Sequence, residues 1–170
     1  MRGFRDNRIL RTYAGSSFMV AFNAWYYSFS PGVAQFIAEH STVRTGVKFF
    51  LYPLMGILRI GAASFHVFPT NPEVGTVLWM LVVSMLTGAV YLALPATAIL
   101  TYSAKARRIA RRLEWPLVVL LLCGLGAVVI AEVSGADILM LVAISGTVLA
   151  ALMTSTLIVS RIVLRLVKRH

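Results

Sequence analysis

Residues 105–169 read KARRIARRLEWPLVVLLLCGLGAVVIAEVSGADILMLVAISGTVLAALMTSTLIVSRIVLRLVKR. Two apolar runs, 117–133 and 138–160, are flanked by basic clusters, and the turn between them has acidic residues at its edges, Glu132 and Asp137. A helix needs about 20 apolar residues to cross the hydrocarbon core of a bilayer, and Lys and Arg are retained on the cytoplasmic side. The stretch therefore predicts a transmembrane hairpin with its ends in the cytoplasm and its turn outside.

The basic residues of the whole chain extend this topology. Fifteen of the sixteen Lys and Arg residues fall into three clusters, and Arg59 stands apart. The clusters are Arg2, Arg5, Arg8, Arg11, Arg44 and Lys48; Lys105, Arg107, Arg108, Arg111 and Arg112; and Arg161, Arg165, Lys168 and Arg169. The run 74–103 is long enough to cross, with Pro95 expected to bend its cytoplasmic end. The weaker run 47–68 must cross as well if all three clusters are to lie on one side. We therefore predict an all-α polytopic membrane protein with four spans and both termini in the cytoplasm.

Composition agrees with a membrane protein. Mean hydropathy is +0.83 and 59% of the residues are hydrophobic, above the roughly 45–50% of soluble domains. The net charge of +10 would suit nucleic acid, but the basic residues flank apolar runs. We therefore expect no nucleic acid partner, and we expect the 105–112 cluster to bind anionic lipid headgroups. Cys123 is the single cysteine, which excludes an intrachain disulfide. The expected location is the plasma membrane of a prokaryote.

Residues 1–46 are expected to form a basic, aromatic-rich segment on the membrane surface, before a transmembrane domain at 47–170. Five aromatic side chains recur on one helical face, as an interfacial anchor would require. They are Phe18, Phe22, Trp25, Tyr26 and Phe29. The tripeptide Ser30-Pro31-Gly32 is expected to end this helix, with a short second helix at 33–40. The alternative is a fifth span at 12–29. No signal peptide is evident, so we expect the N-terminus to be retained.

Part of this N-terminal region resembles a known family. The sequence contains FRD at 4–6, WYYSFSP at 25–31 and AQFIAEH at 34–40. This order resembles the region that follows the cysteine motif in CFI-box-CTERM proteins, over about residues 4–60. The Cys-Phe-Ile element itself is absent here, so no role for its cysteine carries over. The resemblance implies a membrane-associated module rather than a reaction.

Three polar residues stand out at or inside the predicted spans: Arg59, His66 and Glu132. Arg59 lies near the middle of 47–68, where a charge costs about 2.5–3.5 kcal/mol on insertion scales, and His66 follows seven residues later on the same face. In a functional interpretation they serve an ion or substrate path, with Glu132 in a proton path. In a structural interpretation Arg59 pairs with a carboxylate or backbone carbonyls of another subunit. No acidic residue of the chain matches Arg59 in depth, which favours a partner protein.

The sequence shows no catalytic, metal-binding or cofactor-binding motif. It has no phosphate-binding glycine loop, no nucleophile motif and no pair of His residues at ligand spacing. Small residues at helical spacing instead predict close packing between helices in lipid. They are Ala89 and Ala93, Ala127 and Ala131, and Gly146 and Ala150.

The pattern favours a non-catalytic accessory subunit of a larger integral membrane complex, such as a respiratory or copper monooxygenase assembly. Expected partners are other membrane subunits and anionic lipids. The alternative function is a small transporter or channel that uses Arg59, His66 and Glu132. Against it, the sequence lacks the inverted repeats on which many transporters are built.

Overall fold

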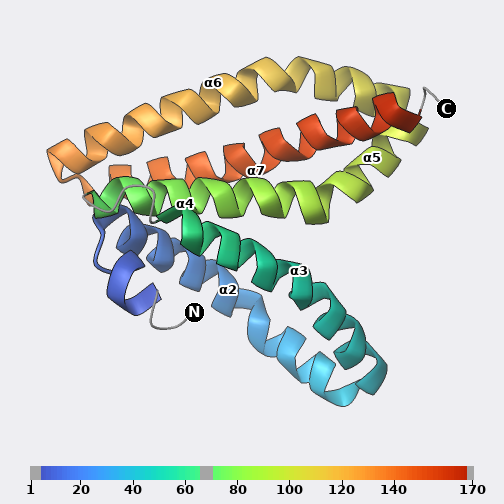
Figure 1. Ribbon diagram of the computed structural model, residues 1–170, viewed down its shortest axis with the longest axis horizontal. Coiled ribbons are helices and arrows are strands. Elements are labelled where there is room, and N and C mark those ends of the chain that lie inside the picture. The colour runs from blue at the N-terminus through green and yellow to red at the C-terminus, as the bar shows by residue number, and fades with distance from the viewer. Residues whose placement is uncertain (1–4, 66–70, 168–170) are drawn as a thin grey trace.

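A computed structural model describes residues 5–65 and 71–167, and in these ranges the chain is helical apart from short turns (Figure 1). One short π-helical segment precedes the α-helices and another lies between two of them. The elements are η1 (Arg5–Ile9), α2 (Tyr13–Glu39), α3 (Ser41–Phe65), α4 (Pro72–Thr87), η2 (Gly88–Leu92), α5 (Ala93–Tyr102), α6 (Ala104–Ser134) and α7 (Asp137–Val167).

Four helical stretches of the described chain are long and apolar enough to cross a membrane, as predicted. They are Thr42–Phe65, Pro72–Tyr102, Ala104–Ser134 and Asp137–Val167. The third is much longer than the apolar run at 117–133, because α6 also includes the basic cluster and Pro116. Its first turn is capped by Ser103, whose hydroxyl accepts the Ala106 N–H. The basic cluster is therefore a helical extension of the span.

Helix α7 is central and packs against α2, α4, η2, α5 and α6. Its buried side chains are mostly small, so that neighbouring backbones approach closely, as they do between helices in lipid. They include Ala143, Thr147, Ala150, Ala151, Thr154 and Ser160. The α6–α7 hairpin turns at Gly135, which has φ of +64° and donates its N–H to the Ala131 carbonyl. Glycine adopts this left-handed conformation without steric cost.

The second span bends where η2 meets α5, as Pro95 predicts (Figure 1). Proline lacks an N–H and disrupts the regular ladder of backbone hydrogen bonds. Two hydroxyls of α7 contact carbonyls on either side of the irregular turn. Thr156 Oγ1 donates to the Gly88 carbonyl at 3.2 Å, and Ser160 Oγ donates to the Ala93 carbonyl at 3.1 Å. The bend is therefore supported by polar contacts to α7, as irregular backbone within a membrane requires.

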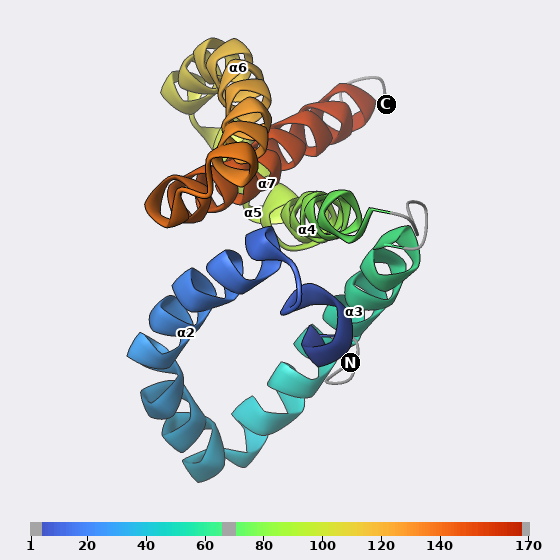
Figure 2. The ribbon, with the colours of Figure 1, turned by 90° about the vertical axis from the view of Figure 1, so that its left-hand side faces the viewer.

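The predicted break at Ser30-Pro31-Gly32 is wrong, because α2 continues without interruption from Tyr13 to Glu39. The same helix covers the predicted second helix at 33–40 as far as Glu39, and the turn to α3 falls at His40. Proline is tolerated inside the helix as a bend rather than a stop, and α2 curves along its length (Figure 2).

The N-terminal segment packs at the end of the bundle where α4 and α7 begin. Glu73 and Asp137 begin α4 and α7, and both form hydrogen bonds to Tyr13. We call this the acidic end; the opposite end, where α6 begins and α7 finishes, is the basic end. Residues 5–13 therefore lie at the opposite end of the bundle from the end of α7 (Figure 1), and the side of the membrane on which each terminus lies stays a prediction.

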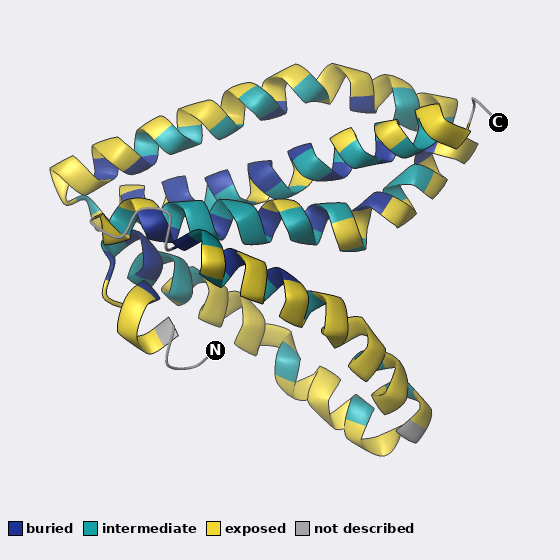
Figure 3. Cartoon of the chain, viewed as in Figure 1, coloured by how far each residue is buried: buried dark blue, intermediate teal, exposed yellow. Residues whose placement is uncertain are grey.

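Beyond its first turns, α2 leaves the bundle and forms a projecting hairpin with α3 (Figures 1 and 2). No residue at 20–39 and none of the described side chains at 42–56 is buried (Figure 3). We call these two segments the aromatic arm, because they expose several large rings. These are Trp25, Tyr26, Tyr27, Phe29, Phe36, Phe49, Phe50 and Tyr52. A hydrogen bond connects the arm to the second span: the Tyr91 hydroxyl donates to the Phe50 carbonyl at 2.5 Å.

Substitution of Gly88 tests the contact between η2 and α7. A Cβ at this position would meet the Leu152 carbonyl oxygen at 2.3 Å and Ser155 Oγ at 2.3 Å. We expect Gly88→Ala to lower the free energy of unfolding in detergent by about 1–3 kcal/mol, the usual cost of overpacking. Gly146→Ala is the matched control, since nothing lies within 4 Å of its Cβ position. Equal stability of the two variants would contradict the close approach.

Candidate functional site

Arg59 lies on the face of α3 that points away from the bundle. Ile57, Gly61 and Phe65 are buried at helical spacing, and the Gly61 backbone contacts the Trp79 and Val83 side chains of α4. Arg59 is two residues from Ile57 and therefore faces roughly the opposite way. Its side chain is exposed and makes no hydrogen bond or ion pair with the described part of the chain. His66, expected on the same face, lies outside the described residues.

Glu132 lies elsewhere, at the acidic end. It lines a cavity of about 280 Å³ between α4 and α6, together with Glu73 and apolar side chains such as Val77 and Val128. Arg59 does not line this cavity. The structure therefore does not gather the predicted polar residues that it describes into one site.

Glu73 has a role that the sequence analysis did not assign. Its two carboxylate oxygens accept the backbone N–H groups of Tyr13, at 2.5 Å, and of Ala14, at 3.2 Å. These N–H groups begin α2, where the helix has no acceptor of its own and the dipole favours a negative charge. The N-terminus of α2 is therefore capped by a carboxylate from α4. The Thr12 hydroxyl accepts the Gly15 N–H at 3.2 Å. It also forms a hydrogen bond with the Thr76 hydroxyl at 3.0 Å, so Thr12 and Glu73 both connect the start of α2 to α4.

Tyr13 completes this junction. Its hydroxyl donates to the Asp137 carboxylate at 2.6 Å, joining the start of α2 to the start of α7. This hydrogen bond, together with desolvation and the charge of Asp137, raises the pKa of Tyr13 to about 12. Thr12 before an apolar run is a recognisable N-cap, but nothing in the sequence indicates that Glu73 and Asp137 are its neighbours.

The predicted interfacial anchor forms a chain of ring contacts along α2. Phe22 stacks on Phe18 with 5.9 Å between ring centroids and on Tyr26 at 5.9 Å. Trp25 and Phe29 meet edge to face at 4.8 Å. Phe18 packs partly against the core, and the other four rings are exposed. The expected surface position of this helix stays a prediction.

The predicted packing residues divide into two groups. Ala93, Ala131 and Ala150 are buried, whereas Ala89, Ala127 and Gly146 are only half-buried. Closer approaches occur at glycines outside these pairs. A Cβ at Gly124 would meet Thr147 Oγ1 at 2.4 Å. Helix contact therefore depends on Gly88 and Gly124 as well as on the alanine stripes.

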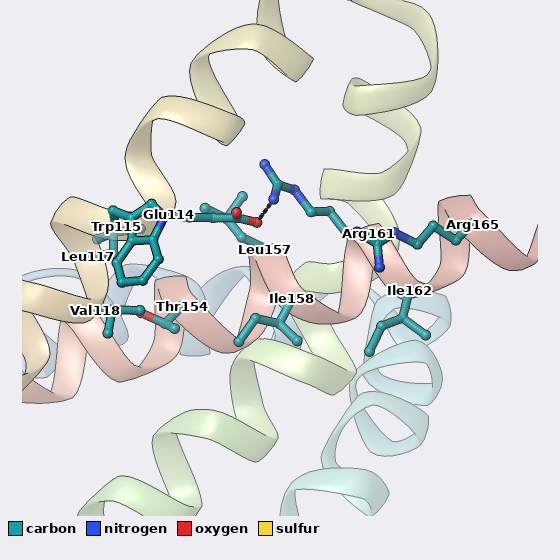
Figure 4. Close-up of a pocket in the computed structure, with 10 residues that line it drawn as sticks. All are labelled: Glu114, Trp115, Leu117, Val118, Thr154, Leu157, Ile158, Arg161, Ile162 and Arg165. Atoms are coloured by element: carbon teal, nitrogen blue, oxygen red, sulfur yellow. Dashed lines mark ion pairs between the residues drawn. The ribbon is translucent and has the colours of Figure 1, made fainter.

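The basic end contains an ion pair between helices (Figure 4). Glu114 of α6 pairs with Nη1 of Arg161 of α7, at the side of a cavity of about 450 Å³ that Trp115 and Thr154 also line. Arg161 Nη2 and Thr154 Oγ1 are buried without a hydrogen-bond partner among the described residues. Of the predicted headgroup residues on α6, Arg107 is half-buried, and the others are exposed: Lys105, Arg108, Arg111 and Arg112.

Comparisons with protein families, with curated proteins and with solved structures found no match to this chain. The resemblance of residues 4–60 to CFI-box-CTERM proteins therefore stays a prediction. Within the described ranges, no three His, Cys, Asp or Glu side chains are grouped as metal ligands would be. The features that a function must explain are the exposed Arg59, the aromatic arm and the arginines of the basic end.

Removal of the Glu73 carboxylate tests the cap of α2. We expect Glu73→Ala to lower the free energy of unfolding by about 1–2 kcal/mol, as loss of an N-cap does, and to speed hydrogen exchange at the Tyr13 and Ala14 amides. Glu132→Ala is the matched control, because Glu132 lines the same cavity but makes no hydrogen bond with the described residues. Unchanged exchange in Glu73→Ala would show that the carboxylate does not hold these amides.

The Tyr13–Asp137 hydrogen bond predicts a dependence of stability on alkaline pH. Because the pKa of Tyr13 is raised from 10.0 to about 12 in the folded protein, its contribution is fully present below pH 10 and is lost as the pH rises through 12. The melting temperature of Tyr13→Phe should therefore lie below that of the wild type under pH 10 and converge with it by pH 12. Tyr27→Phe, at an exposed ring, should show no such difference. A constant gap across this range would contradict the assignment.

Proposed function

We propose that this integral membrane protein is a non-catalytic accessory subunit of a larger membrane protein complex, for example a respiratory or copper monooxygenase assembly. The observation that carries the proposal is Arg59. It is an exposed cation on a candidate span, and it has no ion-pair partner in the part of the chain that the structure describes.

The position of Arg59 explains why a partner is favoured. It is six residues from Phe65, the end of α3, or about 9 Å along the helix axis. Charged side chains within spans usually face a protein interior or pair with another group. The face of α3 that carries Arg59 points away from α4, so such an environment has to come from outside the chain. A carboxylate or helix-end carbonyls of a second subunit would supply it.

The aromatic arm supports the same proposal. Its rings are exposed on two helices that contact each other little beyond the His40 turn (Figure 2). Lipid can cover the apolar rings, whereas the arm also exposes Asn23 and Ser28. A partner helix beside the arm would bury the rings and pair with Arg59 at once.

We further propose that the basic end faces the cytoplasm of a prokaryotic cell. The cluster at 105–112 together with Arg161 and Arg165 lies there, in agreement with the retention of basic residues on that side. In this orientation the C-terminal end of α7 is cytoplasmic. Residues 5–13 contact α4 and α7 at the acidic end, so α2 would have to cross the membrane together with the four candidate spans, which is the alternative of a fifth span near residues 12–29. With this fifth crossing the N-terminal segment would lie outside the cytoplasm, in place of the expected cytoplasmic N-terminus.

The alternative of a small transporter or channel has less support. Arg59 and Glu132 lie on different faces of the bundle, and Glu132 shares its cavity with Glu73 rather than with a cation. Ion or substrate flux in proteoliposomes that contain only this chain would favour the alternative.

Purification from native membranes in mild detergent tests the subunit role. We expect the tagged wild type to bring down partners in fixed stoichiometry, identified by mass spectrometry, and Arg59→Leu to lose most of them. Arg59→Lys should retain more of the complex, since it keeps the charge. Arg108→Leu is the matched control, because Arg108 is an exposed arginine of α6 that lies outside the aromatic arm and α3.

Two outcomes would contradict the proposal. One is a wild-type chain that purifies as a lone monomer. The other is an Arg59→Leu variant that assembles as the wild type does while the activity of the complex is lost, which would indicate a functional role for the guanidinium.

A further inference from the structure

The basic end contains a second pocket, between α5, α6 and α7. Its volume is about 270 Å³, and four arginines line it: Arg107, Arg111, Arg161 and Arg165. The remaining lining residues are Leu100, Ala110 and Leu164, so no acidic side chain lines this pocket. The spacing of four residues within each pair places Arg107 with Arg111 on one face of α6, and Arg161 with Arg165 on one face of α7.

This arrangement has unmatched positive charge. Glu114 is paired with Arg161 through Nη1, and the second terminal nitrogen, Nη2, is buried with no hydrogen-bond partner among the described residues. Four like charges around one pocket repel one another, most strongly where water is scarce. A phosphate group would offset this repulsion and accept hydrogen bonds from several guanidinium groups, an arrangement that arginine favours.

An apolar pocket adjoins the arginines. It has a volume of about 390 Å³ and shares Leu100 and Ala110 with the basic pocket. Apart from Thr156, its other lining residues are aliphatic side chains or methionine, among them Ile99, Leu113 and Met153. A soluble phosphate would leave this surface without a ligand, whereas a lipid has both a phosphate and acyl chains.

We infer that the basic end holds a specific site for one anionic phospholipid, with its phosphate between Arg107, Arg111, Arg161 and Arg165 and an acyl chain along the apolar pocket. Basic pockets between membrane helices are a common form of headgroup recognition. The site goes beyond a general attraction of the 105–112 cluster to anionic lipid, because it needs both α6 and α7. It is also independent of the proposed subunit role, since one chain supplies all of its residues.

Native mass spectrometry of the purified full-length chain tests this site. Phosphatidylglycerol, phosphatidylcholine, glycerol phosphate and inorganic phosphate are added separately to the protein in a zwitterionic detergent. We expect one phosphatidylglycerol to bind at least about tenfold more tightly than phosphatidylcholine, and neither soluble phosphate to bind at the same concentrations.

The matched variants keep the change in charge equal. The double variant Arg111→Gln with Arg165→Gln removes two pocket arginines and leaves the Glu114–Arg161 pair intact. The control, Arg108→Gln with Arg112→Gln, removes two exposed arginines of α6 that do not line this pocket. A charged hydrogen bond contributes enough to change affinity by about tenfold. We therefore expect the pocket variant to lose at least about tenfold in phosphatidylglycerol affinity and the control to lose less than about threefold, with similar melting temperatures.

Three results would overturn the inference. Equal binding of phosphatidylglycerol and phosphatidylcholine would show that the phosphate environment is not selective for an anionic lipid. Equal losses of phosphatidylglycerol affinity in the two double variants would show that the lipid responds to the general surface charge rather than to this pocket. Binding of glycerol phosphate or inorganic phosphate as tight as that of the lipid would assign the pocket to a soluble anion. None of these results bears on co-purification of partners, so the two proposals fail separately.

Discussion

Close approach to α7 is the constraint on which the rest of the structure depends. A membrane protein gains little from burying apolar side chains against each other, because lipid is equally apolar, so its helices associate through tight packing and polar contacts. The small residues of α7 allow η2 and α6 to approach it at Gly88 and Gly124. The hydroxyls of Thr156 and Ser160 then reach carbonyls beside the bend of the second span.

The second determining contact is at the acidic end. Glu73 accepts the first N–H groups of α2, and Tyr13 donates to Asp137, so the start of α2 is held between α4 and α7. Because α2 begins there and continues through Pro31 without a break, it must run away from the bundle. α3 then returns from the His40 turn to pack on α4, where Gly61 meets Trp79 and Val83 and Phe65 meets Gly75. The aromatic arm therefore forms because the start of α2 is fixed at the acidic end by its cap and α2 continues as one helix to Glu39.

Among the arginines of the candidate spans, Arg161 and Arg59 have different electrostatic surroundings. Arg161 has Glu114 on the facing helix, and its other neighbours form an arginine-lined pocket. Arg59 has no such counter-ion among the described residues, and it lies on the face of α3 that is turned away from α4. The charge of Arg161 is thus partly balanced by Glu114 of the same chain. The unbalanced charge of Arg59 is the strongest reason to propose a second protein beside the arm.

The sequence by itself indicated four stretches long and apolar enough to cross a membrane, because the length and composition of an apolar run are local properties. It also indicated the bend at Pro95, since a missing N–H acts on its own helix. It did not reveal that Pro31 merely bends α2, nor that residues 5–13 lie with Glu73 and Asp137. Tertiary structure decided these features, because a helix cap supplied by a residue 60 positions away leaves no periodic pattern. The pairing of Arg107 and Arg111 with Arg161 and Arg165 has the same origin: charge spacing places each pair on one helical face, and only the packing of α6 against α7 joins the two faces into one pocket.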